Sequence, residues 1–131
     1  MALSRTAIIT KIHLVISVIV VIPAAFVYGF NLGEFLDLNF ITVDERSFSK
    51  SIMILYLGFA TLWILGIFKV NFLKTALNSN TFFMSGLVIG RVLSLISDGL
   101  PSTAYILGVI GELILACYGF WVLNGKYMKK L

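Results

Sequence analysis

Four long apolar stretches constrain this chain more than any other feature of its sequence. They cover residues 12–30, 52–68, 82–97 and 104–123. A hydrocarbon core about 30 Å thick needs about 20 mostly apolar residues per helix. Backbone groups in lipid must be hydrogen-bonded within their own segment, so each such stretch has to be helical. The pattern therefore predicts a membrane protein with four transmembrane helices.

The composition also indicates a lipid environment. Hydrophobic residues make up 60% of the 131 residues and charged residues 12%, about half the charged share of a soluble domain. The net charge is +4, but the basic residues do not form a patch with interleaved aromatic side chains. We expect the lipid bilayer to be the main partner of the chain, and we expect no nucleic-acid partner.

The predicted fold is a single all-α domain, an antiparallel four-transmembrane-helix bundle with helices at about 12–30, 43–68, 80–98 and 102–124. Thr42 and Glu45 have the spacing of a capping box, which starts the second helix at 43. A turn at about 70–81 is expected between the second and third helices, with Asn78, Ser79 or Asn80 as the cap of the third helix. Gly99 and Pro101 favour a very tight turn between the last two helices.

The outer loop at 31–42 is the longest predicted connection. Gly33 is expected to end the first helix. The loop is rich in apolar side chains, which are Phe35, Leu36, Leu38, Phe40 and Ile41. It is either an interfacial segment that lies on the outer membrane face or a plain connecting loop.

The basic residues predict how the bundle is oriented. Four crossings place seven of the ten Lys and Arg residues on one side: Arg5, Lys11, Lys69, Lys74, Lys126, Lys129 and Lys130. Cytoplasmic flanks of membrane helices carry such an excess of basic residues. We therefore expect both termini to be cytoplasmic.

Two opposite charges lie inside the last two apolar stretches. Arg91 is ten residues before Pro101, and Glu112 is eleven residues after it. In an antiparallel hairpin these positions face each other at similar depth. A charged side chain in the bilayer costs about 2.5–3.5 kcal/mol even on the mild insertion scale, and a carboxylate can bind Arg through two parallel hydrogen bonds. The spacing predicts a buried Arg91–Glu112 pair.

Polar residues extend from this pair toward the outer surface. Ser94 and Asp98 share a helix face with Arg91, and Tyr105 shares one with Glu112. Tyr56 and Thr61 of the second helix are expected close to the same depth. The predicted ligand-binding set is Arg91, Glu112, Ser94, Asp98, Tyr105, Tyr56 and Thr61. Arg91 would hold the anionic or carbonyl group of a lipid, a quinone-like molecule or a small anion, and Glu112 would orient Arg91.

Small residues also recur along this hairpin. Gly86 and Gly90 form a GxxxG motif that Ser94 extends, and Ala104, Gly108, Glu112 and Ala116 are spaced by four. Such spacing lets helix backbones approach closely in lipid. We expect the last two helices to be in close contact along these residues.

No motif for catalysis, phosphate binding, zinc or a dinucleotide is present. His13 is a lone histidine and is expected at the membrane interface, not in a metal site. Cys117 is expected to be a small core side chain. We expect no catalytic residue, metal or cofactor. Enzymatic activity is the function that the sequence supports least.

Two segments carry a family resemblance. They are Gly90-Arg91-Val92-Leu93-Ser94-Leu95 with Asp98-Gly99-Leu100-Pro101-Ser102, and Leu55-Tyr56-Leu57-Gly58 with Leu65-Gly66-Ile67-Phe68. With Glu112, these segments resemble an uncharacterised bacterial family catalogued as domain of unknown function 4345. The resemblance implies a four-helix multi-pass protein of the bacterial inner membrane. It implies no activity.

Three functions stay open at this stage. The first is a binding module for a lipid or another small hydrophobic or anionic ligand at Arg91–Glu112. The second is a structural or accessory membrane protein that self-associates as a homo-oligomer or supports a larger complex, with the same pair as a buried lock. The third is a small transporter, which a chain of this length could form only as an oligomer.

Overall fold

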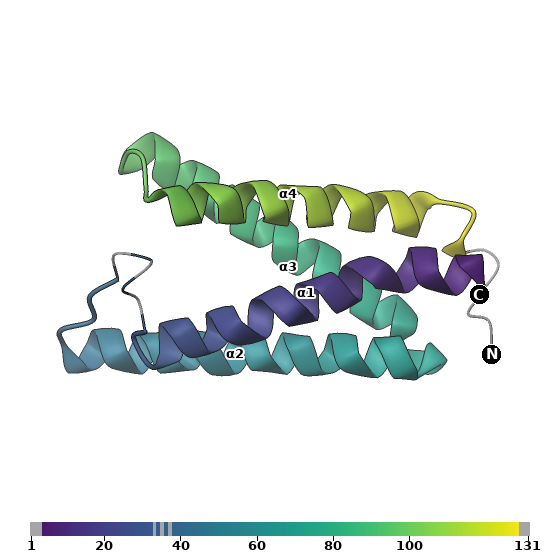
Figure 1. The fold of residues 1–131 in the computed structure, drawn as a ribbon, viewed down its shortest axis with the longest axis horizontal. Helices are drawn as coiled ribbons and strands as arrows, with labels where there is room; N and C mark the ends of the chain where they lie inside the picture. Colours follow the sequence, from purple (N-terminus) through teal and green to yellow (C-terminus); the bar gives the residue numbers. More distant parts are fainter. Residues whose placement is uncertain (1–3, 33, 35, 37, 129–131) are drawn as a thin grey trace.

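The computed structural model describes residues 4–32, 34, 36 and 38–128, and these form four helices and no strand. The helices are α1 (Arg5–Gly29), α2 (Val43–Phe68), α3 (Val70–Ser97) and α4 (Thr103–Asn124). All four are long and apolar enough to cross a membrane. They alternate in direction, and both termini lie at the same end of the bundle (Figure 1). The predicted all-α bundle is confirmed.

The first helix is longer than its apolar stretch. It begins at Arg5, seven residues before the predicted start at 12, because the Ser4 side chain accepts a hydrogen bond from the Ala7 backbone N–H at 3.2 Å. A Ser in this position satisfies one of the free N–H groups at a helix start. The helix was predicted from its continuous apolar stretch alone, so its first two turns, residues 5–11, were missed.

The predicted turn at about 70–81 is wrong, because this segment is helical. Lys69 is the single non-helical residue between α2 and α3. Residues 70–81 contain neither Gly nor Pro, so nothing in them breaks a helix. The expected capping residue Asn80 is fully buried inside α3. Ser79, another expected cap, accepts a hydrogen bond from Trp63 Nε1 at 3.2 Å.

The start of the second helix follows the predicted capping box, which the structure confirms. Glu45 Oε2 accepts from the Thr42 backbone N–H at 2.8 Å, and Thr42 Oγ1 accepts from the Glu45 backbone N–H at 3.2 Å. In the preceding loop, Leu36 and Leu38 are half-buried. Several residues named in the sequence predictions lie outside the described residues: Gly33, Phe35, Lys129 and Lys130.

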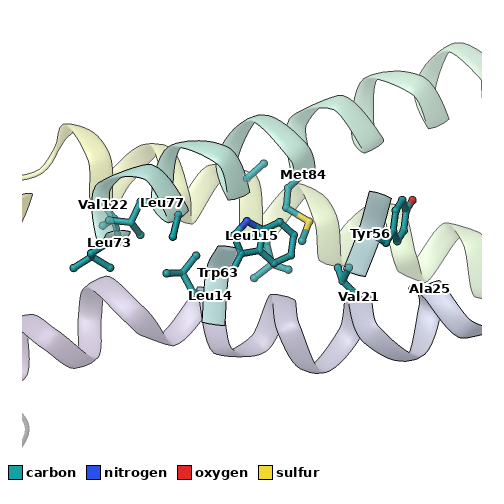
Figure 2. Packing of buried hydrophobic residues seen from close by; sticks show 12 residues of the cluster. Leu14, Val21, Ala25, Tyr56, Trp63, Leu73, Leu77, Met84, Leu115 and Val122 are labelled. Carbon is teal, nitrogen blue, oxygen red and sulfur yellow. The ribbon is translucent and has the colours of Figure 1, made fainter. Parts of the chain in front are cut away.

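The core runs along the middle of the bundle and takes side chains from every helix (Figure 2). Trp63 is fully buried and packs edge-on against Phe83, with ring centroids 5.2 Å apart. Tyr56 also packs edge-on against Phe83, at 5.0 Å. Large apolar side chains cover the outside of the bundle as well, including Ile19, Phe82 and Ile96. An apolar exterior of this kind suits lipid as the solvent.

Two contacts join the helices near the chain termini. Lys11 Nζ donates to the carbonyl of Ile67, in the last turn of α2, at 2.7 Å. A cation is stabilising at a helix C-terminus, where carbonyls lack partners within the helix. The Tyr118 hydroxyl donates to the Ile9 carbonyl at 2.8 Å and ties α4 to α1.

The close helix contacts differ from those predicted from the GxxxG spacing. A Cβ atom built at Gly86, Gly90 or Gly108 would meet nothing within 4 Å. Close approach occurs instead at Gly119, against Thr81, and at Gly66, against Ala76. The contact between α3 and α4 beside these glycines is the ion pair of Arg91 and Glu112.

Candidate functional site

Arg91 and Glu112 form an ion pair across α3 and α4. Arg91 Nη2 donates a hydrogen bond to Glu112 Oε1 at 2.8 Å, and Arg91 Nε lies 2.8 Å from Glu112 Oε2. The exposed fractions of the two side chains are 18% and 13%. The predicted contact between these residues is therefore present, and each charge has its counter-charge.

The turn between α3 and α4 sets this geometry. α3 ends with the Asp98 backbone N–H bonded to the Ser94 carbonyl at 2.8 Å. Gly99 follows with φ at 98°, a conformation that glycine adopts without steric cost. α4 starts four residues later, at Thr103. Such a short connection fixes the register of the two helices and brings Arg91 and Glu112 to matching depth.

Three tyrosines surround the pair. The Arg91 guanidinium carbon lies 4.8 Å from the centre of the Tyr105 ring, a cation–π contact. Tyr28 of α1 is a side-chain neighbour of both Arg91 and Tyr105. It also packs edge-on against Tyr56, with ring centroids 5.7 Å apart.

Tyr28 was not among the predicted site residues. The sequence placed Tyr56 and Tyr105 in the site, but it gave no role there to Tyr28, which lies near the outer end of the first apolar stretch. The similar depth of the three tyrosines was the signal that could have included Tyr28, and the fold brings Tyr28 next to Arg91.

Two cavities have Arg91 in their walls. The larger, about 550 Å³, lies against Tyr105, Ile106 and Val109 of α4 and includes Ser94 and Gly90. The smaller, about 370 Å³, is lined by all four helices, among them residues Tyr28, Tyr56, Met84, Gly108, Gly111 and Glu112. These cavities lie against different faces of α4. Glycines that were expected to hold helices together instead leave room in the cavity walls.

Of the other predicted site residues, Ser94 lines a cavity beside Arg91, whereas Asp98 and Thr61 do not. Ser94 lines the larger cavity, and its hydroxyl donates to Asp98 Oδ2 at 2.9 Å. Asp98 is exposed at the end of α3 and lines neither cavity. Thr61 is exposed, and its hydroxyl donates to the Leu57 carbonyl. Five helical residues turn Thr61 about 140° away from Tyr56, so the two do not share a face.

A histidine, His13, is buried in the half of the bundle that holds the termini. His13 is 1% exposed, and neither ring nitrogen has a hydrogen-bond partner among the described residues. Its ring lies 5.2 Å from that of Tyr118. Because α1 begins at Arg5, His13 lies about 12 Å along the helix at 1.5 Å per residue, and its burial between helices was not predicted. Its location at the membrane interface stays a prediction.

Cys117 also differs from its prediction. It is a free cysteine on the exposed side of α4, not a core residue. Leu115 and Ala116 are the buried residues in this turn.

The fold and the pair together define a class of protein: a small bundle of four helices that are long and apolar enough to span a membrane, with an ion pair between the last two. The chain belongs to the family described as Domain of unknown function (DUF4345), which it matches over residues 9–123. No curated protein and no solved structure matches it.

Proposed function

We propose that this protein binds an amphipathic, lipid-soluble molecule whose acceptor oxygen meets Arg91. The observation that carries the proposal is that one partly buried guanidinium lies in the walls of two largely apolar cavities. Their volumes, about 550 and 370 Å³, fall within the ~300–1,000 Å³ range of small-molecule sites. Intramembrane ionisable residues mark functional sites by default.

The chemistry of the pair favours a neutral head over a free anion. Glu112 contacts the Nε and Nη2 edge of Arg91, which leaves the Nη1 edge for another acceptor. As an ion pair, Arg91 and Glu112 carry no net charge. A carbonyl or ester oxygen can therefore accept from Arg91 without an excess charge entering the bundle, while the apolar body of the ligand lies against the cavity walls.

The proposal includes a location. It places the protein in the bacterial inner membrane with both termini in the cytoplasm, so that Arg91 and Glu112 lie in the outer half of the bilayer. The support is the excess of basic residues at the end of the bundle that holds the termini.

This orientation can be tested by thiol labelling after Cys117→Ser removes the native thiol. An impermeant thiol reagent should label Ser47→Cys in intact cells. It should label Ser4→Cys only after the cells are opened. The reverse labelling pattern would contradict the proposed orientation.

Ligand binding can be tested without disturbing the charged pair. Gly108→Leu and Gly111→Leu project a side chain into the smaller cavity, where a Cβ meets nothing within 4 Å. Gly86→Leu is the matched control, since it is equally open and lines neither cavity. The small molecules that co-purify with each variant are identified by mass spectrometry, and folding is checked by circular dichroism.

We expect a molecule bound to the wild type to be lost from the Gly108 and Gly111 variants and kept by the Gly86 variant. The same set of molecules in all four proteins would contradict binding in this cavity.

The second candidate function is structural. Arg91 and Glu112 satisfy each other's charge while mostly buried, as expected of a lock in a structural or accessory membrane protein. If the function is structural, the glycine variants that fill the cavity should co-purify with the same molecules as the wild type. Variants that break the Arg91–Glu112 pair should destabilise the bundle.

A further inference from the structure

We infer a second binding site, a groove between α3 and α4 that takes the phosphate headgroup and upper acyl chain of an anionic phospholipid. The groove has a volume of about 460 Å³ and lies in the half of the bundle that holds the termini. Its lining includes Lys74, Asn78, Phe82, Phe120, Leu123 and Asn124. None of them lines the cavities at Arg91.

The lining changes from polar to apolar with depth. Lys74 lies four residues after the start of α3, and Asn124 is the last residue of α4, so both are near the same membrane surface. Phe82 lies eight residues beyond Lys74, about 12 Å deeper, and Phe120 lies one turn deeper than Asn124. A phospholipid that enters the groove from the membrane has its headgroup and its acyl chain in this same order.

The charge of this end of the bundle favours an anion. Lys74 is exposed and forms no ion pair with any described residue. The Asn78 and Asn124 side chains likewise have no hydrogen-bond partner in the described part of the chain and can donate to phosphate oxygens. Lys69 and Lys126 add positive charge at the same end. The acidic residues that the structure describes lie elsewhere, toward the opposite end or beside Arg91.

The groove fits a lipid better than a free phosphate ion. Phe82 and Phe120 are exposed large apolar side chains, 74% and 49% accessible. A free ion would use only the Lys74 end, whereas a phospholipid also covers both rings. Lys can extend its aliphatic stem along the apolar wall and keep its ammonium at the headgroup level.

The test counts lipids bound to the full chain by native mass spectrometry, with phosphatidylglycerol titrated into detergent micelles. Lys74→Gln should weaken phosphatidylglycerol binding about fivefold, since one basic residue near an anionic lipid surface contributes about 1 kcal/mol. Lys69→Gln is the control, since Lys69 is equally exposed and outside the groove. It should change binding less than twofold. Phosphatidylcholine binding should be equal in all three proteins.

Further measurements distinguish a bound phospholipid from diffuse electrostatic attraction and from binding of a free phosphate ion. Phe120→Ala should also weaken phosphatidylglycerol binding, because it removes one of the rings that the acyl chain covers. Equal loss in the Lys69 and Lys74 variants would overturn the inference in favour of diffuse attraction. Displacement of phosphatidylglycerol by an equal concentration of inorganic phosphate, or full binding by Phe120→Ala, would overturn it in favour of a headgroup ion alone.

Discussion

Arg91 and Glu112 meet through two atom pairs, both at 2.8 Å, although 21 residues separate them in the chain. The turn that joins their helices is short enough to leave one register in which both charges are paired. The hairpin geometry and the ion pair therefore depend on each other. A shift of one helix by a single residue, about 1.5 Å, would already strain both contacts.

Removal of either partner should destabilise the bundle more than removal of both. Arg91→Met leaves the mostly buried Glu112 carboxylate without its counter-charge. Glu112→Leu likewise leaves the Arg91 guanidinium without its counter-charge. We expect each to lower the free energy of unfolding by about 2–3 kcal/mol, below the ~3–5 kcal/mol of a fully buried pair because some solvent reaches both groups. The double variant should recover much of this loss in thermal unfolding followed by tryptophan fluorescence. Additive losses would show that the two residues are not energetically coupled.

The contact at Gly66 should tolerate no side chain. Gly66→Ala places a Cβ against the Cβ of Ala76, which has no rotamer by which to move away. We expect a loss of about 1–3 kcal/mol from overpacking between α2 and α3. Gly86→Ala is the control and should be neutral or stabilising by up to about 1 kcal/mol, because alanine has the higher helix propensity. Equal melting temperatures for the two variants would contradict the close packing at Gly66.

His13→Leu should raise stability. Burial of His13 leaves two ring nitrogens without a described partner, and an apolar side chain of similar size removes that cost, about 1–3 kcal/mol. Leu14→Ala, at the adjacent fully buried position, should instead lower stability by about 2–5 kcal/mol. A lower melting temperature for His13→Leu would mean that the imidazole makes a favourable polar contact in the folded protein.

Lys11→Met should loosen the contact between α1 and α2. It keeps most of the aliphatic stem but removes the donor that bonds the Ile67 carbonyl. We expect a loss of about 1 kcal/mol, the usual net contribution of one hydrogen bond. Lys50→Met serves as the control, because Lys50 is exposed, and should change stability by less than about 0.5 kcal/mol. An equal effect of both variants in the same thermal assay would assign the loss to charge alone.

The parts of the fold that sequence predicted are those set by hydropathy and local spacing. The four apolar stretches became four helices, and Thr42 and Glu45 formed their capping box. The Arg91–Glu112 contact followed from counting residues on both sides of one turn, because a tight hairpin converts sequence distance into depth.

The parts that sequence missed depend on neighbours that are distant along the chain. Residues 70–81 looked polar enough for a turn, but Asn80 is buried by packing that only the assembled bundle provides. Gly90 and Gly108 have the spacing of a contact motif, yet a Cβ at either position would meet nothing within 4 Å. Tyr28 joins the site only because α1 packs along α2.

Lys69 has a consequence for how the bundle can move. With one extended residue between them, α2 and α3 have no spare chain with which to separate, and α3 and α4 are held by their own short turn. α1 packs mainly on α2 and touches α4 little. Lateral entry of a molecule from the membrane toward Gly108 and Gly111 is therefore favoured between α1 and α4, which are not consecutive in the chain and share few contacts.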